Sequence, residues 1–527
     1  MAEAAAFWVA YLLSLLFLTW FLFQKRSRQH LPPGPQGSYL YGVKNQLPPA
    51  EPWKTYAKWS ETYRSPIISF RVYNRTIVVL NDIESIHTLL DQRAQIYSER
   101  PMSWMYNVIC GRGKSVFNIP ASNPRHRIYR RMLQAGLGQR ATKEAWDILR
   151  EEAEVLVAGL AKQPEDWIQH IRRNAAGVIM KVAFGYSIAS PEDLFIKVAE
   201  ETSKISGWAM APGRWLVDYY PIMRHIPSFI PGTQWKRQGL AWRERLNYLS
   251  EVPHNWVKQQ MKKNNTYPKS FTSRFLQSHL DDEDGSVFSK LKSHQGGEDE
   301  DIVKWCAGGL YAGAADTTVS ALTSFVLLMA LYPEVQRKAG QEIDIVLGIE
   351  DGSVDSSRFS SPISDMEQLG ALGYLQAVMK EVLRYAPVGN LALPHATLYE
   401  DQYQGYTIPK GASVIPNVWA VMHDPKMYHE PFAFRPERFT NEGSAEPDPR
   451  QFAYGFGRRS CPGSHFAETS MLLSMANILT FYSITPQESS LMEKTRGLEF
   501  TTGITSNIRP FPVRITPRRA ASYAPPA

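Results

Sequence analysis

The stretch YGFGRRSCPG, residues 454–463, surrounds one cysteine, Cys461, with three glycines and two arginines. Glycines allow positive φ and close backbone approach, so the sulfur can face a large flat group. Amides of the loop and of the helical pattern that follows favour the thiolate form of the sulfur. A buried structural cysteine, the common alternative, would not need these surroundings. A dinucleotide-binding loop is excluded because Ser460 replaces its third glycine and no apolar strand leads into it.

Composition narrows the class of protein. The chain has 527 residues, a net charge of +7 and 44% hydrophobic residues, which excludes global disorder. Its three cysteines, Cys110, Cys306 and Cys461, are too few for a disulfide framework, an iron–sulfur cluster or a four-thiolate zinc site. A lone reactive thiol in a reducing compartment is therefore expected. The mild positive charge suits a membrane surface or an acidic partner and argues against nucleic-acid binding.

The N-terminus predicts a membrane anchor. Residues 7–23, FWVAYLLSLLFLTWFLF, carry no charge, and a helix of this length reaches about 25 Å. Lys25, Arg26 and Arg28 follow it, so the positive-inside rule places the remaining chain in the cytosol. A cleaved signal peptide is the alternative, but a basic start and a small-residue cleavage site are both missing. We expect a single-pass signal anchor over residues 1–24 and a proline-rich hinge over 25–38.

The body is expected to be mainly α with a minor β region, in one domain over residues 39–527. Alternation predicts a hairpin from 67–72 and 76–80. Helical patterns cover 302–331, 333–347 and 372–386, and a last long helix is expected to open at Cys461. A short β tail is expected to end near Ile515.

The cysteine loop resembles the ligand loop of the cytochrome P450 family, whose pattern is FxxGxxxCxG. Gly457, Cys461 and Gly463 match, and Tyr454 stands in place of the usual Phe. The resemblance implies the cytochrome P450 fold with an N-terminal transmembrane helix, and a haem-thiolate catalytic domain over residues 39–527. It also implies haem b as cofactor, with Cys461 as the axial iron ligand and Arg459 as a propionate partner.

Two further segments resemble structural motifs of the same family. Glu381 and Arg384 lie three apart beside an apolar helical stripe, where they can meet on one flank. Such a pair is usually a solvated surface pair. With FRPERF at 434–439, however, it resembles the ExxR helix and PERF loop, which implies that Arg384 and Arg438 share the Glu381 carboxylate. We expect this triad to be structural.

GAADTT, residues 313–318, resembles the oxygen-binding groove [AG]GxDT, with Ala314 replacing a glycine. An ordinary close helix crossing is the alternative. Small residues let a flat group press on the helix, and Thr317 can divert backbone hydrogen bonding. The resemblance implies that Thr317 donates a hydrogen bond to bound dioxygen and that Asp316 helps to deliver protons.

Candidate propionate ligands come from two weaker matches. Residues 125–131, RHRIYRR, resemble the WxxxR helix: Arg130 keeps the arginine, whereas His126 replaces the tryptophan. An imidazole can still donate a hydrogen bond. His395 lies where the family often has a propionate-binding Arg or His, with a solvent-contacting loop histidine as the alternative.

The resemblance implies a monooxygenase that inserts one oxygen atom from O2 into a small lipophilic substrate, in secondary metabolism or xenobiotic oxidation. Only 66 residues follow Cys461, which leaves no room for a flavin or nicotinamide domain. NADPH would therefore act indirectly, through NADPH–cytochrome P450 reductase, with cytochrome b5 as a second candidate partner. A basic docking face would comprise Arg125, Arg127, Arg131 and Arg458.

The implied location is the endoplasmic reticulum membrane, with the catalytic domain in the cytosol. The nearest resemblance is to the fungal microsomal type and its O-methylsterigmatocystin-oxidoreductase-like group, in segments 215–221 and 408–411. By the same resemblance a pocket would draw on 102–116, 208–215, the helix around Tyr311, 388–393 and 501–505, with Tyr311 among the residues that make it apolar. Two other functions stay open: a haem isomerase or dehydratase that needs no O2, and a non-enzymatic haem-binding or scaffold protein.

Overall fold

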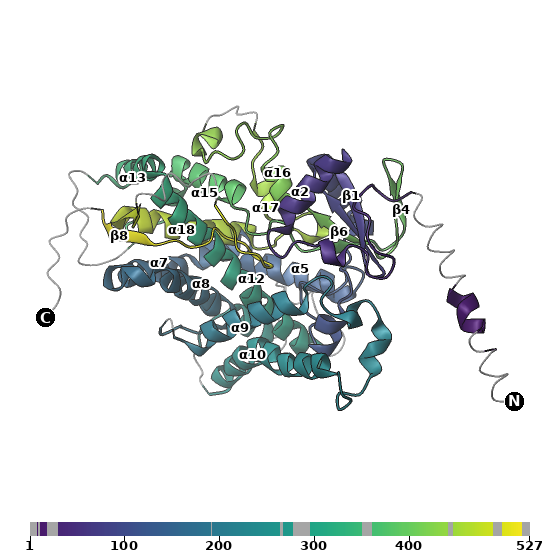
Figure 1. Ribbon diagram of the computed structural model, residues 1–527. Helices are drawn as coiled ribbons and strands as arrows, with labels where there is room; N and C mark the ends of the chain where they lie inside the picture. The colour runs from purple at the N-terminus through teal and green to yellow at the C-terminus, as the bar shows by residue number, and fades with distance from the viewer. Residues whose placement is uncertain are drawn as a thin grey trace.

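The computed structural model describes residues 8, 11–17, 30–190, 192–263, 267–277, 296–349, 361–440, 446–488 and 498–518. Helices fill most of the body, and the main sheet lies at one end, near the N-terminal segment (Figure 1). The architecture is therefore mainly α with small sheets, as predicted.

The centre of the fold is α12 (Gly296–Leu331), which packs against α8 (Trp167–Phe184), α10 (Gln234–Lys263), α15 (Gly373–Tyr385) and α18 (Ser464–Phe481). In the part of the chain that the structure describes, Asp299–Leu331 is the one helix long and apolar enough to cross a membrane, and 72% of its apolar window is buried. Its apolar character therefore belongs to a core helix. The predicted helix from 302 to 331 is confirmed and begins earlier.

The other longer helices lie around α12 and the helices that it contacts (Figure 1). They are α2 (Pro52–Tyr63), α5 (Pro124–Leu137), α7 (Trp146–Lys162), α9 (Leu194–Ala209) and α13 (Pro333–Leu347). Shorter α-helices are α3 (Ile83–Ile86), α4 (Ala94–Tyr97), α6 (Gln139–Glu144), α11 (Phe271–Gln277), α14 (Met366–Gly370), α16 (Val418–Met422) and α17 (Arg450–Ala453). Single helical turns of 3₁₀ or π type are Lys44–Gln46, His87–Gln92, Trp104–Ile109, Pro164–Asp166, Leu216–Asp218, Pro221–His225, Pro436–Phe439 and Gly457–Arg459.

The main sheet has the strand order β1-β2-β6-β3. The predicted hairpin is confirmed as β1 (Ile67–Val72) and β2 (Arg75–Leu80), and its turn places Tyr73 at φ 51°. β6 (Ser413–Pro416) runs parallel to β2, and β3 (His395–Ala396) closes the sheet. Two small antiparallel pairs complete the β region: β4 (Asp401–Tyr403) with β5 (Tyr406–Ile408), and β7 (Tyr482–Pro486) with β8 (Val513–Pro517).

The part of the proline-rich segment that the structure describes is fixed to the body, and its residues 31–38 lie outside helices. The carbonyls of Pro32 and Pro33 accept hydrogen bonds from the Ser69 hydroxyl at 2.6 Å and the Ser69 amide at 2.9 Å. A Cβ at Gly34 would lie 1.9 Å from the Ser69 carbonyl oxygen, so only glycine fits there. Of the predicted anchor, Trp8 and residues 11–17 are helical and exposed; its other residues lie outside the described part.

Candidate active site

The glycines of the cysteine loop are required by close backbone contacts. Gly457 has φ 54°, and a Cβ there would lie 2.2 Å from the Leu90 carbonyl oxygen. A Cβ at Gly463 would meet Leu137 at 2.8 Å. The Cys461 amide donates to the Tyr454 carbonyl at 2.7 Å, which closes the loop. The following helix, α18, begins at Ser464, three residues later than predicted.

Two properties of Cys461 together indicate that its thiol lies in a recess of the body and not on the outer surface. Its side chain is accessible, yet burial within the protein raises the pKa of the thiol, which an outer surface residue would not show. The Gly463 amide, which donates to the sulfur, and nearby Arg130 act in the opposite direction. The amide contribution predicted from the sequence is therefore present, but burial is the larger effect, so the thiolate needs a further positive partner.

Besides Cys461, two solvent-accessible residues lie on the core helix α12. Ala312 and Thr317 are exposed, although the flanking turns of this helix are buried. The Thr317 hydroxyl donates to the Gly313 carbonyl at 2.8 Å, the diversion of backbone hydrogen bonding that the sequence predicts. Because α12 packs directly against α18, these exposed positions lie on the helix next to the one that follows the Cys461 loop.

The glycines of α12 serve packing. A Cβ at Gly309 would lie 2.4 Å from Val116, and one at Gly313 would lie 3.0 Å from Phe117. Tyr311 is fully buried, and its hydroxyl donates to the Phe195 carbonyl of α9 at 2.5 Å. The expectation that Tyr311 lines the pocket is therefore wrong, because its ring is enclosed between two helices.

Asp316 has a partner that sequence reasoning missed. The Ser203 hydroxyl, carried by α9, donates to its carboxylate. No sequence spacing links residues 113 positions apart on two helices, so only the packing of α9 on α12 shows this contact.

Three arginines and two histidines converge near the cysteine loop. Burial and the Arg459 charge lower the pKa of Arg100. Burial and the Arg130 charge lower the pKa of Arg459 to about 10, although the nearby Glu99 carboxylate acts in the opposite direction. Burial, Arg459 and Arg130 lower the pKa of His126 to about 4. Burial and Arg100 lower the pKa of His395 to about 3. These mutual effects require that the five groups lie close together. We call them the cation cluster: Arg100, His126, Arg130, His395 and Arg459.

Backbone carbonyls orient the cation cluster. Arg100 donates to the carbonyls of Phe117, Leu393 and Pro394 at 2.7–2.9 Å. Arg459 donates to those of Ser98 and Ile119 at 2.8 and 2.6 Å. Arg130 donates to the carbonyl of Ser460, next to the cysteine.

His395 is buried, and its Nδ1 lies 2.7 Å from the Tyr97 carbonyl. The alternative of a solvent-contacting loop histidine is therefore excluded. The predicted Arg130, Arg459, His126 and His395 come together as expected, whereas Arg100 was missed. Its only sequence signal, an arginine between Glu99 and Pro101, is not specific.

These residues fit a haem with an axial thiolate. The cation cluster contains three arginine charges and two histidines, and Glu99 is the one carboxylate among the causes of their pKa shifts, so it favours a dianion such as two propionates. Among the described residues no group of three or more His, Cys, Asp or Glu could hold a metal ion. A lone accessible thiol, Cys461, suits a metal that a macrocycle already holds on its other sides.

The histidines of the cluster predict a pH dependence of the haem-free protein. Their folded pKa values lie below the ordinary value of 6.5, so the unfolded chain binds more protons and stability falls as pH falls from about 6.5 to about 4. We expect each histidine to contribute a loss of about 2 kcal/mol between pH 7 and 5. Chemical unfolding at the two pH values measures this. In the haem-loaded protein the loss should be smaller, because propionates offset the arginine charges.

The variant His126→Trp is the matched control, since it removes one titrating group and keeps a ring. It should reduce the pH dependence by about half. An unchanged dependence would contradict the assignment of the effect to His126.

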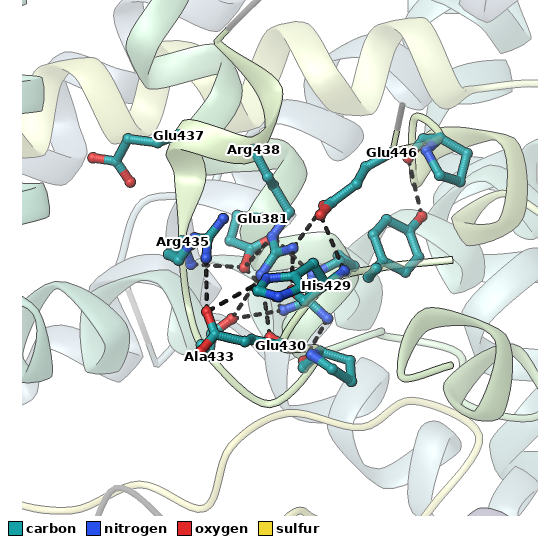
Figure 2. Close-up of polar contacts among 12 residues, drawn as sticks. Glu381, His429, Glu430, Ala433, Arg435, Glu437, Arg438 and Glu446 are labelled. Carbon is teal, nitrogen blue, oxygen red and sulfur yellow. Dashed lines mark hydrogen bonds and ion pairs between the residues drawn. The ribbon is translucent and has the colours of Figure 1, made fainter. Parts of the chain in front are cut away.

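The predicted structural triad is confirmed. Arg384 donates to the two Glu381 carboxylate oxygens at 2.7 and 2.9 Å, and Arg438 donates to the same carboxylate at 3.3 Å. All three side chains are at most 1% exposed. Glu446, which sequence reasoning missed, accepts from Arg438 at 2.6 Å (Figure 2). Each buried charge thus has a partner.

The proposed docking arginines separate into two kinds. Arg127, Arg131 and Arg458 are exposed. Arg125 is 14% exposed and pairs with Asp301 at 2.8 Å. Its place in the docking face is therefore a wrong prediction, because the charge is used inside the protein.

Comparison with known proteins agrees with this site. The cytochrome P450 family model matches residues 32–511. The chain is 34% identical to cytochrome P450 monooxygenase claR of Ampulloclitocybe clavipes, over 94% of this chain and 88% of that protein. It is 34% identical to cytochrome P450 monooxygenase ppsD of Aspergillus oryzae, over 95% and 92%. It is 32% identical to tryptamine 4-monooxygenase of Psilocybe cyanescens, over 93% and 94%.

The chain therefore belongs to the cytochrome P450 family and is a haem-dependent monooxygenase. Membership of this family implies a small substrate and a redox partner.

Proposed function

We propose that this enzyme inserts one atom of O2 into a small lipophilic substrate of fungal secondary metabolism. The second oxygen atom leaves as water, and NADPH supplies two electrons through a separate reductase. The observation that carries the proposal is the Cys461 thiol, which is accessible although burial raises its pKa, and which lies near a cluster of three arginines and two histidines. Similarity to fungal monooxygenases, including a tryptamine 4-monooxygenase, supports the setting.

The site residues take distinct roles in this proposal. Cys461 would ligate the haem iron, and the cation cluster would hold the propionates. The bound haem supplies the oxidising chemistry, and the thiolate donates electron density that favours O–O cleavage. Thr317 presents its hydroxyl at the exposed face of α12, and Asp316 passes protons inward from solvent.

Thr317→Ala tests the proposed oxygenation. We expect product formed per NADPH oxidised to fall at least about ten-fold, because alanine lacks the hydroxyl that places a proton at the site. Reconstitution with a fungal reductase, under air and with a substrate found by spectral binding screens, measures product, NADPH and hydrogen peroxide together. Thr317→Ser keeps the hydroxyl and should keep the coupling.

An isomerase or dehydratase would behave differently in the same assay. Its turnover would continue under nitrogen and without reductase, and this result would overturn the monooxygenase proposal. A scaffold protein would show no turnover with any compound that shifts the haem spectrum.

The redox partner is proposed to be NADPH–cytochrome P450 reductase, with cytochrome b5 as a second donor. The exposed Arg127, Arg131 and Arg458 provide positive charge for an acidic partner. Reductase-driven turnover should then fall as ionic strength rises. The charge reversal Arg131→Glu should lower reductase-driven turnover without a change in haem content.

Residues 1–24 are proposed to anchor the enzyme in the endoplasmic reticulum membrane, with the domain from residue 39 in the cytosol. Uncharged residues 7–23 and the basic residues after them support this orientation. Resistance to alkaline carbonate extraction, lost on deletion of residues 1–24, tests the anchor. The resemblance to the O-methylsterigmatocystin-oxidoreductase-like group stays a prediction, to be tested with its aromatic polyketide substrates in the binding screen.

A further inference from the structure

The helix α9 contacts α12 through two side-chain hydrogen bonds. Tyr311 of α12 donates to the Phe195 carbonyl near the start of α9 at 2.5 Å. Eight residues later, the Ser203 hydroxyl of α9 donates to the Asp316 carboxylate of α12. Over eight residues a helix rises about 12 Å, so the two bonds fix α9 along its length.

The Ser203 contact is the one that reaches the proposed proton-delivery residues. Asp316 precedes Thr317, whose own hydroxyl is engaged by the Gly313 carbonyl. The carboxylate is therefore directed at α9, and Ser203 sets its position. Both Ser203 and Asp316 are partly exposed, so solvent can reach this contact.

One helical turn before Ser203, α9 carries an ion pair at the protein surface. Glu200 precedes Ser203 by three residues on α9, and its carboxylate, 33% exposed, pairs with Arg172 of α8 at 2.8 Å. Residues three apart share one face of a helix. Ser206, three residues further on, lies 2.8 Å from the Tyr106 hydroxyl instead. One face of α9 thus carries a polar row whose members have different partners.

We propose that Ser203 is a positioning residue for proton delivery in this enzyme. Its hydroxyl holds the Asp316 carboxylate on the solvent side of α12 and makes proton delivery depend on the position of α9. The proton that Asp316 takes up comes from solvent and leaves toward the site, so no net charge accumulates. This inference rests on the proposed role of Asp316 in oxygenation.

The contact itself is tested without turnover. Thermal unfolding of the full-length, haem-loaded protein is compared for Ser203→Ala, Asp316→Asn and the double variant. Each single change should lower the melting temperature by about 2 °C, and the double variant should be no lower than the worse single variant. Additive shifts would overturn the contact.

The functional test is the solvent deuterium isotope effect on product formation, measured with the substrate from the binding screen. Ser203→Ala should at least double the isotope effect and reduce product per NADPH about ten-fold. Ser203→Thr should restore both values. Ser206→Ala, the matched control, removes the same atom from the same helix face and should change neither value.

The outcomes separate the two ideas. If Asp316→Asn changes neither coupling nor isotope effect, the proposed role of Asp316 fails. If Asp316→Asn changes both and Ser203→Ala changes neither, the positioning role of Ser203 alone fails.

Discussion

Replacement of Cys461 by serine should abolish the thiolate-type Soret band of the reduced, carbon-monoxide-bound protein. Turnover should fall by at least about 1,000-fold, equivalent to about 4 kcal/mol of activation free energy. A serine hydroxyl does not donate electron density as a thiolate does. The loop should keep its shape, because Gly457 and Gly463 set its close backbone contacts and a serine hydroxyl can still accept from the Gly463 amide. The carbon-monoxide difference spectrum and product formation measure the two effects.

Cys306→Ala is the matched control. Cys306 is fully buried in α12, and burial raises the pKa of its thiol, so it stays protonated and inert. This variant should keep the thiolate-type band. A normal band in Cys461→Ser, or its absence in well-folded wild type, would reject Cys461 as the ligand.

Replacement of Glu381 by glutamine should destabilise the fold by about 3–5 kcal/mol. The change removes the charge that Arg384 and Arg438 share in a site at most 1% exposed. Glu446 still pairs with Arg438, but the side-chain acid bonded to Arg384 is lost. The midpoint of denaturant unfolding and the haem content of purified protein measure the loss; midpoints are compared because a bound cofactor complicates two-state treatment.

Glu437→Gln is the control from the neighbouring loop. Glu437 is 40% exposed, pairs with Lys338 at 2.7 Å and points away from the triad (Figure 2). An exposed pair of this kind contributes at most about 1 kcal/mol. Equal losses in the two variants would show that burial of the triad does not decide its contribution.

The helical patterns predicted long elements well. The helix from Pro333 to Leu347 has its predicted bounds, and that from 373 to 385 differs by one residue at each end. The final helix begins at Ser464 and not at Cys461, since Pro462 and Gly463 follow the cysteine and complete the loop first. Periodicity identifies a buried face, but the first turn depends on local backbone geometry.

The triad shows which contacts a sequence can reveal. Glu381 and Arg384 lie on one helix, and the PERF loop supplies Arg438, so the resemblance to the family's two motifs was sufficient to imply the triad. Arg100 and Ser203 carry no comparable signal. Arg125 looked like a surface charge by its position in a basic run, but its partner, Asp301, lies on a helix 176 residues away.

The sequence by itself determined the helical class of this protein and the single thiol available for chemistry, because these depend on composition, period and local pattern, and its resemblance to family motifs implied the residues of the triad. Only the tertiary structure decided that Cys461 is accessible within a buried setting, that three arginines and two histidines gather near it and that Asp316 is held by Ser203. Burial and electrostatic repulsion depend on distances between elements, and those distances exist only when the helices have packed.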